Sequence, residues 1–335
     1  MMHMPKRVGA SKLEEVEERV EEVDLTDVSG VGRITADKLR SVGIKSVRQL
    51  SLYTAEELSD LLDIDEERAR RILRNARHLV GLKPTPLRAK EVLSEWEGVT
   101  KLTTGVKAID DLLGGGLEPK SIYEFVGEYG TGKTQICHQL AVTVQLSPDK
   151  GGVNGRAVYI DTEGTFSPQR IVSIAERFDV DPDYALENVF TFRPINVDHL
   201  EDFTRTVFDM CESDDVKLVI VDSLIALYRA QFRGRGMLAA RQQRINYFLD
   251  RLRRAAVAYT VYVVVTNQVM DKPMPGLMNI KIPAGGNIVA HGTTHRIFLT
   301  KRGEKMWSLK VFDSPRISKD VEVNFKITER GVEDI

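Results

Sequence analysis

The chain has 335 residues, of which 42% are hydrophobic and 29% charged, and its net charge at pH 7 is −2. This composition is ordinary for a globular protein, and no apolar run is long enough to predict a transmembrane helix or a secretory leader. The two cysteines, Cys137 and Cys211, lie far apart and match no disulfide or metal pattern, which is typical of a reducing cytoplasm.

Residues 1–24 are rich in glutamate and are predicted to form an acidic N-terminal tail. Within this tail an alternative is open, because the apolar residues recur at helical spacing and suit a short amphipathic helix: Leu13, Val16, Val20 and Val23. The solvated tail is the simpler interpretation.

Residues 25–80 are predicted to form a small all-α domain. Gly30 and Gly32 make a Gly-x-Gly turn ahead of a helix expected over 35–42, which Gly43 ends. Such a turn can present backbone N–H groups to a phosphate. The pattern resembles a helix-hairpin-helix, which grips the DNA backbone without reading its sequence. Gly30 and Gly32 are therefore predicted DNA contacts.

A second hairpin is expected from helices over 54–62 and 66–80. Its turn, 63–65, has two acids and no glycine, so we predict a structural role rather than a phosphate site. The last helix carries three arginines on one face, Arg70, Arg74 and Arg77. A solvated face is the default interpretation, and a patch facing DNA is the alternative.

Residues 81–98 are predicted to be a linker, since prolines and a glycine interrupt it before a short helix over 87–96. From 99 to 335 strands and helices alternate, which predicts an α/β core with a mostly parallel central sheet. Buried strands are expected over 157–160, 218–221 and 261–265. The alternating segments 296–301, 306–312 and 321–327 predict antiparallel edge strands.

Residues 127–134 match the phosphate-binding loop Gly-x4-Gly-Lys-[Ser/Thr], between a strand over 122–126 and a helix over 135–144. Its glycines, Gly127, Gly130 and Gly132, permit turns that aim N–H groups at phosphate oxygens. Lys133 supplies charge to the β- and γ-phosphates, and the Thr134 hydroxyl is suited to Mg²⁺. The loop predicts a nucleotide with Mg²⁺ as the ligand.

Three further strands end in polar residues that would meet this loop. Asp222 is expected to hold Mg²⁺ through water. Glu163 is preferred to Asp161 as the group that orients the attacking water, because Gly164 allows a turn into the site; capping the next helix is the alternative role for both acids. Gln268 is predicted to sense the γ-phosphate, with a strand cap as the alternative.

A set of motifs occurs in order: Gly-Glu-Tyr-Gly-Thr-Gly-Lys-Thr-Gln (127–135), Tyr-Ile-Asp-Thr-Glu-Gly-Thr-Phe (159–166), Arg-Gly-Met-Leu-Ala-Ala-Arg-Gln-Gln (235–243), Val-Thr-Asn-Gln-Val (265–269), Gly-Gly-Asn-Ile-Val-Ala-His (285–291) and Asp-Ser-Pro (313–315). Over residues 25–335 the chain resembles the RadA family of archaeal strand-exchange recombinases, within the RecA superfamily. The Gly-Gly-Asn segment is closer to the eukaryotic members. The resemblance implies a RecA-like P-loop ATPase core with an N-terminal helix-hairpin-helix domain, and it implies that the nucleotide is ATP.

The resemblance also implies roles for individual residues. Glu163 would activate water and Gln268 would sense the γ-phosphate, so these two and Lys133 are the expected catalytic residues. Arg170 would stack on adenine, which suits a planar guanidinium. Asp313 and Pro315 would cover the ATP of a neighbouring subunit. The full set of expected nucleotide contacts is Gly127, Glu128, Tyr129, Gly130, Thr131, Gly132, Lys133, Thr134, Gln135, Arg170, Asp313 and Pro315.

Two DNA loops are implied by the same resemblance. The first covers 228–241; eight arginines and only one acid, Asp250, occur between positions 229 and 254, a density that suits phosphate neutralisation. Ion pairing with distant acids is the alternative. The second loop, about 269–283, carries apolar side chains suited to wedging between bases, or to packing on its own sheet. The predicted DNA contacts in the core are Arg229, Arg233, Arg235 and Arg241.

The resemblance also implies that residues 81–98 serve subunit polymerisation. One departure concerns this assembly, because Pro86 stands where the family has a phenylalanine that plugs into the neighbouring subunit. Leu82 and Leu87 are the alternative anchors. The overall prediction is a cytoplasmic, nucleoid-associated, DNA-dependent ATPase. It would form homo-oligomeric filaments or rings on single-stranded DNA and exchange strands with double-stranded DNA in recombinational repair. The alternatives are a regulatory paralogue with weak self-assembly and a small-molecule phosphotransferase.

Overall fold

The computed structural model describes residues 23–82, 85–272, 280–319 and 321–335. By contacts the chain divides into two compact units between Val92 and Leu93, a point inside the predicted linker. The acidic tail expected over 1–24 lies almost entirely outside the described residues. Among the residues that the structure describes, no helix combines the length and the apolarity needed to cross a bilayer.

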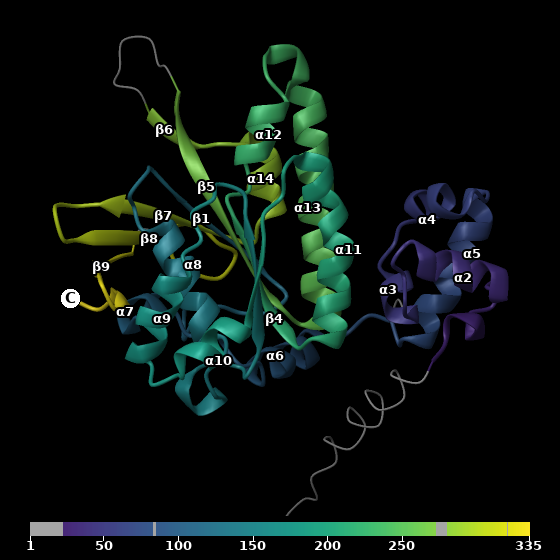
Figure 1. Cartoon of the computed structure of the whole chain (residues 1–335), viewed down its shortest axis with the longest axis horizontal. Helices are drawn as coiled ribbons and strands as arrows, with labels where there is room; N and C mark the ends of the chain where they lie inside the picture. Colours follow the sequence, from purple (N-terminus) through teal and green to yellow (C-terminus); the bar gives the residue numbers. More distant parts are fainter. Residues whose placement is uncertain (1–22, 83–84, 273–279, 320) are drawn as a thin grey trace, which may run out of the picture. The chain divides into compact units, whose positions relative to one another are not determined.

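The N-terminal unit is all-helical, as its hydrophobic spacing predicts (Figure 1). Side-chain caps begin its helices: Thr54 forms a capping box with Glu57, and Ser46 and Asp65 accept from the third backbone N–H of their helices. Its elements are η1 (Leu25–Asp27), α2 (Arg33–Ser41), α3 (Val47–Ser51), α4 (Ala55–Leu62) and α5 (Glu66–Leu79), followed by α6 (Ala89–Glu97) at the boundary of the two units. Apart from the short η1 and α3, which the sequence analysis did not anticipate, the helices lie close to their expected positions.

The arginines on α5 make contacts inside this unit. Arg77 donates to the backbone carbonyls of Ser51 and Tyr53, at 3.1 and 2.9 Å. Arg70 pairs with Glu66 and Glu67 on its own helix. These contacts favour the solvated face over the patch facing DNA.

The larger unit is built on one sheet in the order β10-β9-β8-β7-β1-β5-β4-β2-β3. The strands from β7 to β3 run parallel, whereas β8, β9 and β10 are antiparallel, which confirms the expected edge. The strands are β1 (Ile122–Gly127), β2 (Arg156–Asp161), β3 (Val189–Phe192), β4 (Val216–Asp222), β5 (Tyr262–Lys272), β6 (Ile280–Pro283), β7 (His295–Lys301), β8 (Trp307–Asp313), β9 (Glu322–Thr328) and β10 (Gly331–Glu333).

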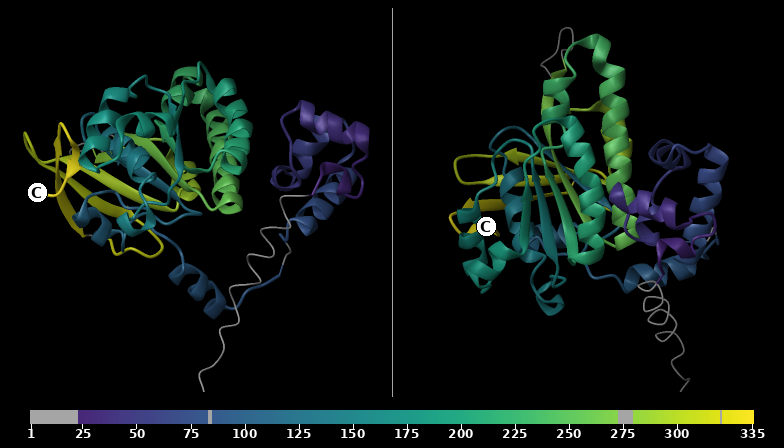
Figure 2. Two further views of the ribbon diagram at one scale, coloured as in Figure 1. Left: turned by 60° about the horizontal axis from the view of Figure 1, so that its bottom comes forward. Right: turned by 45° about the vertical axis from the view of Figure 1, so that its right-hand side comes forward.

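Helices cover both faces of this sheet (Figures 1 and 2). On one face α8 packs Ile136 and Leu140 against Tyr123 and Phe125 of β1 in the largest apolar core. On the other face α13 contacts β1 and β5, and α11 contacts β4. The helices are α7 (Lys107–Leu112), α8 (Lys133–Thr143), α9 (Pro168–Arg177), α10 (Pro182–Glu187), α11 (Val197–Ser213), α12 (Ala226–Gln231), α13 (Leu238–Tyr259) and α14 (Gly286–Gly292), with 3-10 turns η2 (Pro148–Lys150) and η3 (Arg235–Met237).

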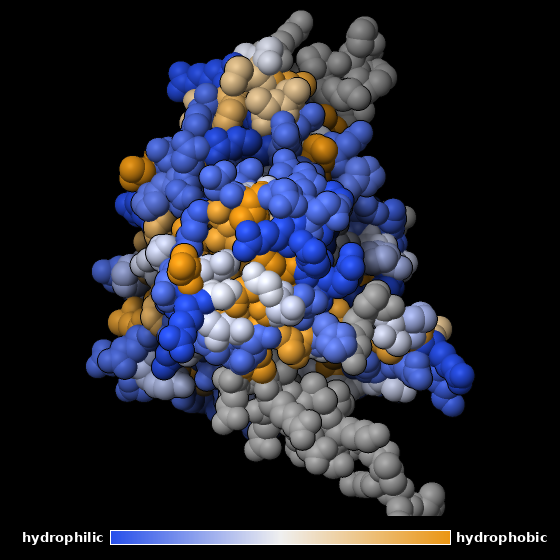
Figure 3. All heavy atoms as spheres, turned by 90° about the vertical axis from the view of Figure 1, so that its right-hand side faces the viewer, coloured by the Kyte–Doolittle hydropathy of each residue, from blue (hydrophilic) through white to orange (hydrophobic). Residues whose placement is uncertain are grey.

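Strand β5 is longer than the expected 261–265 and continues beyond the parallel sheet. There it pairs antiparallel with β6, Met270 opposite Ile282. The expectation of a loop over about 269–283 is therefore wrong at both ends, because 269–272 belong to β5 and 280–283 to β6, while residues 273–279 lie outside the described part. On the face of the molecule shown in Figure 3, hydrophilic side chains predominate and apolar ones appear in small groups.

His295, at the start of β7, is a buried titratable group (1% exposed). Its ring stacks on Tyr123 with centroids 4.5 Å apart, and its Nδ1 lies 2.9 Å from the Ser314 hydroxyl. Its Nε2 has no hydrogen-bond partner among the described residues. Burial lowers the pKa of His295 to about 4, because the charged ring would lose its hydration.

Acid should therefore destabilise the fold through His295. The unfolded chain takes up the proton near the ordinary pKa of 6.5, so the stability is present above that pH and is lost as the pH falls towards 4. The loss is on the order of 2–3 kcal/mol. Urea unfolding of the wild type and of His295→Leu at several pH values checks this. If the free energy of unfolding changed with pH to the same extent in both proteins, His295 would not be the cause of the acid destabilisation.

Candidate nucleotide site and DNA-facing surfaces

The phosphate loop opens into a crevice of about 1470 Å³ at the carboxyl edge of the parallel strands. Ligands of open α/β sheets bind at this edge. The loop residues from Glu128 to Gln135 line it, together with side chains of β4 and β5 and of the segments just after β2 and β4. The same crevice contains Thr134, Glu163, Arg170, Asp222, Arg229 and Gln268. The structure therefore brings together most of the nucleotide-site residues that the sequence predicts.

The loop is tight where β1 ends. A Cβ at Gly127 would lie 2.5 Å from the Thr131 hydroxyl oxygen and 2.6 Å from the Leu299 carbonyl oxygen, so only glycine fits. Gly132 precedes α8 in the left-handed region with φ of 93°. The Lys133 ammonium donates to the carbonyls of Gly127 and Glu128 at 3.0 and 2.7 Å, and burial lowers its pKa. A phosphate would compete with these carbonyls for the ammonium.

Glu163 and Gln268 are in direct contact at the mouth of the crevice. The Gln268 amide donates to the Glu163 carboxylate at 2.9 Å, and the Ser223 hydroxyl donates to the same oxygen at 2.7 Å. Ser223 was not anticipated, because a serine after a strand carries no distinguishing signal. The three groups form a polar triad beside the phosphate loop.

Asp161 has a different role. Its carboxylate accepts from the backbone N–H groups of Gly164, Thr165 and Phe166, and it pairs with Arg193 at 3.0 Å. Burial alone would raise its pKa, but these donors outweigh burial and lower it. Asp161 thus fixes the turn that carries Glu163, which favours Glu163 as the group available to a water.

Asp222 is buried, with one carboxylate oxygen accepting from Tyr159 at 2.7 Å and the other from Thr266. It lines the crevice with Thr134. A hydroxyl and a carboxylate suit Mg²⁺, which takes oxygen ligands and commonly completes its shell with water and phosphates. Among the described residues no cluster of three or more His, Cys, Asp or Glu could hold a metal by itself. The Thr134 hydroxyl and the Asp222 carboxylate, both lining the crevice, fit Mg²⁺ that arrives with a nucleotide.

Arg170, in the first turn of α9, also lines the crevice. It donates to Gln135 at 2.6 Å, to the Thr328 carbonyl at 2.7 Å, and to the Glu329 carbonyl. The guanidinium is thereby held between α8 and the turn after β9, with its plane fixed by three acceptors. This fixed plane suits the predicted stacking on a base.

Asp313 and Pro315 do not join this crevice. Asp313 is the last residue of β8, about 20 Å along the strand from Trp307, which does line it. The Asp313 carboxylate pairs with Lys319 at 3.0 Å. Asp313 and Pro315 therefore do not line the nucleotide crevice of their own chain. This agrees with the predicted role, in which they cover the ATP of a neighbouring subunit.

Trp307 is a site residue that the sequence analysis missed, since a tryptophan in an alternating strand is usually a core residue. Its indole N–H donates to the Gly130 carbonyl of the phosphate loop at 2.9 Å. The Lys301 ammonium lies 5.8 Å from its ring centroid. The first residue of β8 thus contacts the loop that would carry the nucleotide.

Nucleotide binding should change the fluorescence of Trp307. The chain has two tryptophans, so Trp96→Phe leaves Trp307 as the single indole emitter, and titration with Mg-ATP should give a saturable signal. Trp307→Phe removes one hydrogen bond to the loop and should weaken ATP binding roughly fivefold, as expected from about 1 kcal/mol. If the fluorescence change persisted in Trp307→Phe and was lost in Trp96→Phe, Trp307 would not lie beside the nucleotide.

Four of the eight arginines between positions 229 and 254 are engaged within the protein. Arg244 pairs with Asp198 and Glu201 of α11, at 2.7 and 2.6 Å, and Arg254 pairs with Asp250. Arg251 is buried and donates to Thr204, and Arg253 donates to the Gly292 carbonyl. The alternative of ion pairing with distant acids is correct for Arg244. Arg254 pairs with the nearby Asp250, whereas Arg251 and Arg253 are held by hydrogen bonds to a hydroxyl and a carbonyl.

The remaining four are the predicted DNA contacts. Arg229 and Arg233 are exposed, and Arg241 is half-buried. The Arg233 Nε donates to the Ala230 carbonyl at 2.9 Å, which leaves the rest of its guanidinium available. Arg235 begins η3, and its side chain lies outside the described residues. The expectation of a loop over 228–241 is therefore wrong in part, because η3 and the start of α13 make 235–241 helical.

The glycine turn of the N-terminal unit has the geometry that the sequence predicts. Gly30 has φ of 98° and lies against Ile72, while Gly32 stands at the N-cap of α2, where an added Cβ would meet no atom within 4 Å. Ile34, in the first turn of α2, is 87% exposed. The N-terminus of α2 is thus open to solvent on this unit, as a backbone-binding hairpin requires.

A phosphate loop at the carboxyl edge of a parallel sheet, facing Glu163, Asp222 and Gln268, defines a P-loop nucleotide-binding protein with a RecA-like core. The chain belongs to the Rad51 family, whose model matches residues 96–335. A second model, the SAM-like helix-hairpin-helix tandem, matches residues 22–78. Among curated proteins, the DNA repair and recombination protein RadA of Aeropyrum pernix is 41% identical over 319 residues, 95% of this chain and 99% of that protein. The predicted fold class and family are confirmed.

Proposed function

We propose that this chain is an ATP-dependent recombinase that assembles on single-stranded DNA and exchanges strands with homologous double-stranded DNA during repair. Family membership over most of the chain supports this. The observation that carries the mechanism is the course of β5, which holds Gln268 beside the phosphate loop and runs within a few residues into the β5–β6 hairpin. One strand thus spans the nucleotide crevice and the second predicted DNA loop.

Hydrolysis would use the residues around the crevice in separate roles. The phosphate loop and Lys133 bind the β- and γ-phosphates. Mg²⁺ held through Thr134 and Asp222 would neutralise charge on the phosphate oxygens. Glu163 orients a water and accepts its proton as the water oxygen bonds to the γ-phosphorus and the bond to the β–γ bridging oxygen breaks.

Gln268 would report the state of the nucleotide. Its amide donates to Glu163 in this structure and would donate to a γ-phosphate oxygen when ATP is bound. The exchange between these acceptors would move β5 at Gln268 and so bias the part of β5 that pairs with β6 from Val269 onward. ATP and DNA would then favour the same conformation of the protein, so that binding of either one raises the affinity for the other.

DNA contacts are assigned to Arg229, Arg233, Arg235 and Arg241, with Gly30 and Gly32 as backbone contacts of the N-terminal unit. The Arg229→Ala, Arg241→Ala double variant should bind single-stranded DNA more weakly, and its log Kd against log salt slope should fall by about 1.4, or 0.7 for each lost phosphate contact. Fluorescence anisotropy in a salt series measures this slope. Arg205→Ala on α11 is the control, and an unchanged slope in the double variant would remove both residues from the interface.

Self-assembly is proposed with ATP shared between subunits through Asp313 and Pro315. Leu82 and Leu87, 46% and 55% exposed near Pro86, are available to replace the aromatic anchor of the family. Electron microscopy with ATP and single-stranded DNA, beside an ATPase assay, tests the proposal. Helical filaments and DNA-stimulated hydrolysis are expected. Their absence would favour the regulatory paralogue, which the proline at position 86 supports.

A further inference from the structure

Three buried polar side chains form a cluster across neighbouring strands of the sheet. Glu124 of β1 and Asn267 of β5 are 0% exposed, and Arg296 of β7 is 6% exposed. The Asn267 amide donates to one oxygen of the Glu124 carboxylate at 2.6 Å, and the Arg296 Nε donates to the other at 2.6 Å. Glu124 is therefore the shared acceptor of the cluster.

The Asn267 branch leads to the sensor and to the hairpin. The Asn267 amide nitrogen also donates to the Ala284 carbonyl at 2.7 Å, and its amide oxygen accepts from the Gln268 backbone N–H at 2.8 Å. The Ala284 N–H in turn donates to the Gln268 carbonyl at 2.9 Å. Gln268 and the residue that follows β6 are thus fastened to each other and to Glu124.

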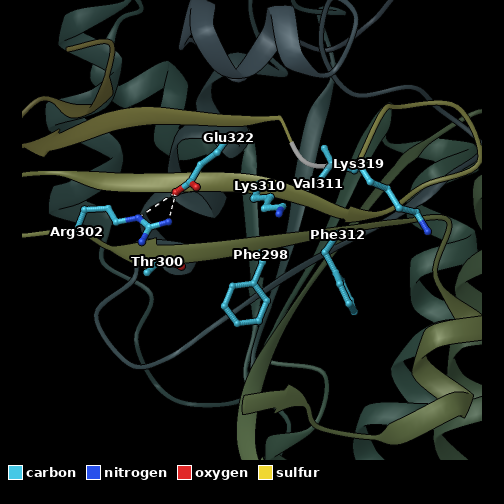
Figure 4. A pocket seen from close by; sticks show the side chains of 8 residues that line it. All are labelled: Phe298, Thr300, Arg302, Lys310, Val311, Phe312, Lys319 and Glu322. Atoms are coloured by element: carbon cyan, nitrogen blue, oxygen red, sulfur yellow. Dashed lines mark hydrogen bonds and ion pairs between the residues drawn. The ribbon is translucent and has the colours of Figure 1, made fainter. Parts of the chain in front are cut away.

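The Arg296 branch leads to the segment before Asp313. The Arg296 guanidinium lies 4.7 Å from the centroid of the Phe312 ring. Phe312 is on the rim of a groove of about 300 Å³ across β7, β8 and β9, where its ring projects beside that of Phe298 (Figure 4). Glu124 itself stands three residues before Gly127, where the phosphate loop begins. The cluster joins three segments that the proposed function uses.

Packing alone does not require a buried ion pair and an amide at this position. Apolar side chains of similar volume commonly replace a buried ion pair at little cost in stability, whereas polar partners fix one register. Here the fixed register is that of β1, β5 and β7, in which Gly127 lies opposite Gln268. Since β1 leads into the phosphate loop, β5 carries Gln268, and Arg296 of β7 contacts Phe312 beside Asp313, the register of these strands sets the geometry between those segments.

We propose that Glu124 is a positioning residue that, through Asn267 and Arg296, holds the Gln268 strand and the segment before Asp313 in register with the phosphate loop. The inference rests on the proposed function and deepens it. Movement of Gln268 on loss of the γ-phosphate is passed through Asn267 to Ala284, and so to the strand returning from the second DNA loop. Without the cluster, ATP still binds but its state no longer reaches the DNA-binding hairpin.

The test is Asn267→Asp in the full chain, which keeps the size of the side chain and its acceptor for Gln268. It loses the donors to Glu124 and Ala284 and places two carboxylates together. We expect the stimulation of ATPase by single-stranded DNA, as a ratio of kcat values with and without DNA, to fall about tenfold. The KM for ATP without DNA should stay within about twofold, because the variant touches no phosphate-loop atom.

Asn188→Asp is the matched control. Asn188 is 6% exposed, accepts from Arg156 and donates to the Tyr184 carbonyl, at the far edge of the sheet from the crevice. It should keep the wild-type ratio. A purely structural role for Asn267 would lower the thermal midpoint and leave the DNA stimulation ratio unchanged, and that result overturns the proposal.

Arg296→Lys serves if Asn267→Asp does not fold, as judged by circular dichroism. Lysine keeps a positive charge near Glu124 but loses the planar contact with Phe312. A fall of about threefold in the stimulation ratio with an unchanged KM supports the proposal, and a wild-type ratio overturns it. A wild-type protein whose ATPase ignores DNA would instead overturn the proposed function.

Discussion

Glu163→Gln is expected to bind ATP as the wild type does and to hydrolyse it about 10²–10⁴-fold more slowly. Glutamine fills the same space and can still accept from Ser223 and Gln268, but it cannot take a proton from water. Glu163 contacts no phosphate-loop atom in the hydrogen bonds described, so ground-state binding should not change. Single-turnover hydrolysis, with binding followed by the Trp307 signal, separates the two steps.

Ser223→Ala is the companion variant for Glu163. It removes one donor to the carboxylate and leaves the base in place, so it should slow hydrolysis by far less than Glu163→Gln does. Normal turnover in Glu163→Gln would exclude the assigned role. If the hydrolysis rate fell equally in Glu163→Gln and Ser223→Ala, the position of the carboxylate, rather than its basicity, would limit the rate.

Local patterns in the sequence were sufficient for the site's scaffold. The phosphate loop, the strands ending in Asp222 and Gln268, and the antiparallel edge follow from spacing and from the period of apolar residues. Short elements such as β3 and β6 were missed. Each is four residues long, and their pairing with β2 and β5 depends on tertiary contacts that a local pattern does not contain.

The arginine-rich segment shows why charge counting within a window fails. Arg244 pairs with two acids, Asp198 and Glu201. Both belong to α11, more than 40 residues earlier in the chain. A helix that packs alongside α13 supplies partners that the local sequence lacks. The Glu124 cluster escaped prediction for the same reason, because each member reads as an isolated polar residue in an apolar strand.

Lys133→Ala should abolish ATP binding at ordinary concentrations. Removing a charge-assisted donor to phosphate costs about 3 kcal/mol or more, which raises the Kd over 100-fold. Burial lowers the pKa of Lys133, so its ammonium is lost at a lower pH than that of an exposed lysine. Bound phosphate favours the ammonium, and wild-type affinity should therefore fall on the alkaline side before other lysines titrate.

Isothermal titration with ATP from pH 7 to 10 measures both effects. Lys150→Ala is the control, because Lys150 is an exposed lysine of η2 that lines no part of the crevice. The Lys133→Ala variant should also keep its thermal midpoint, since Lys133 donates only to two loop carbonyls and belongs to no ion pair among the described residues. Wild-type ATP affinity in Lys133→Ala would mean that the nucleotide binds elsewhere, and the coupling through Gln268 would fail with it.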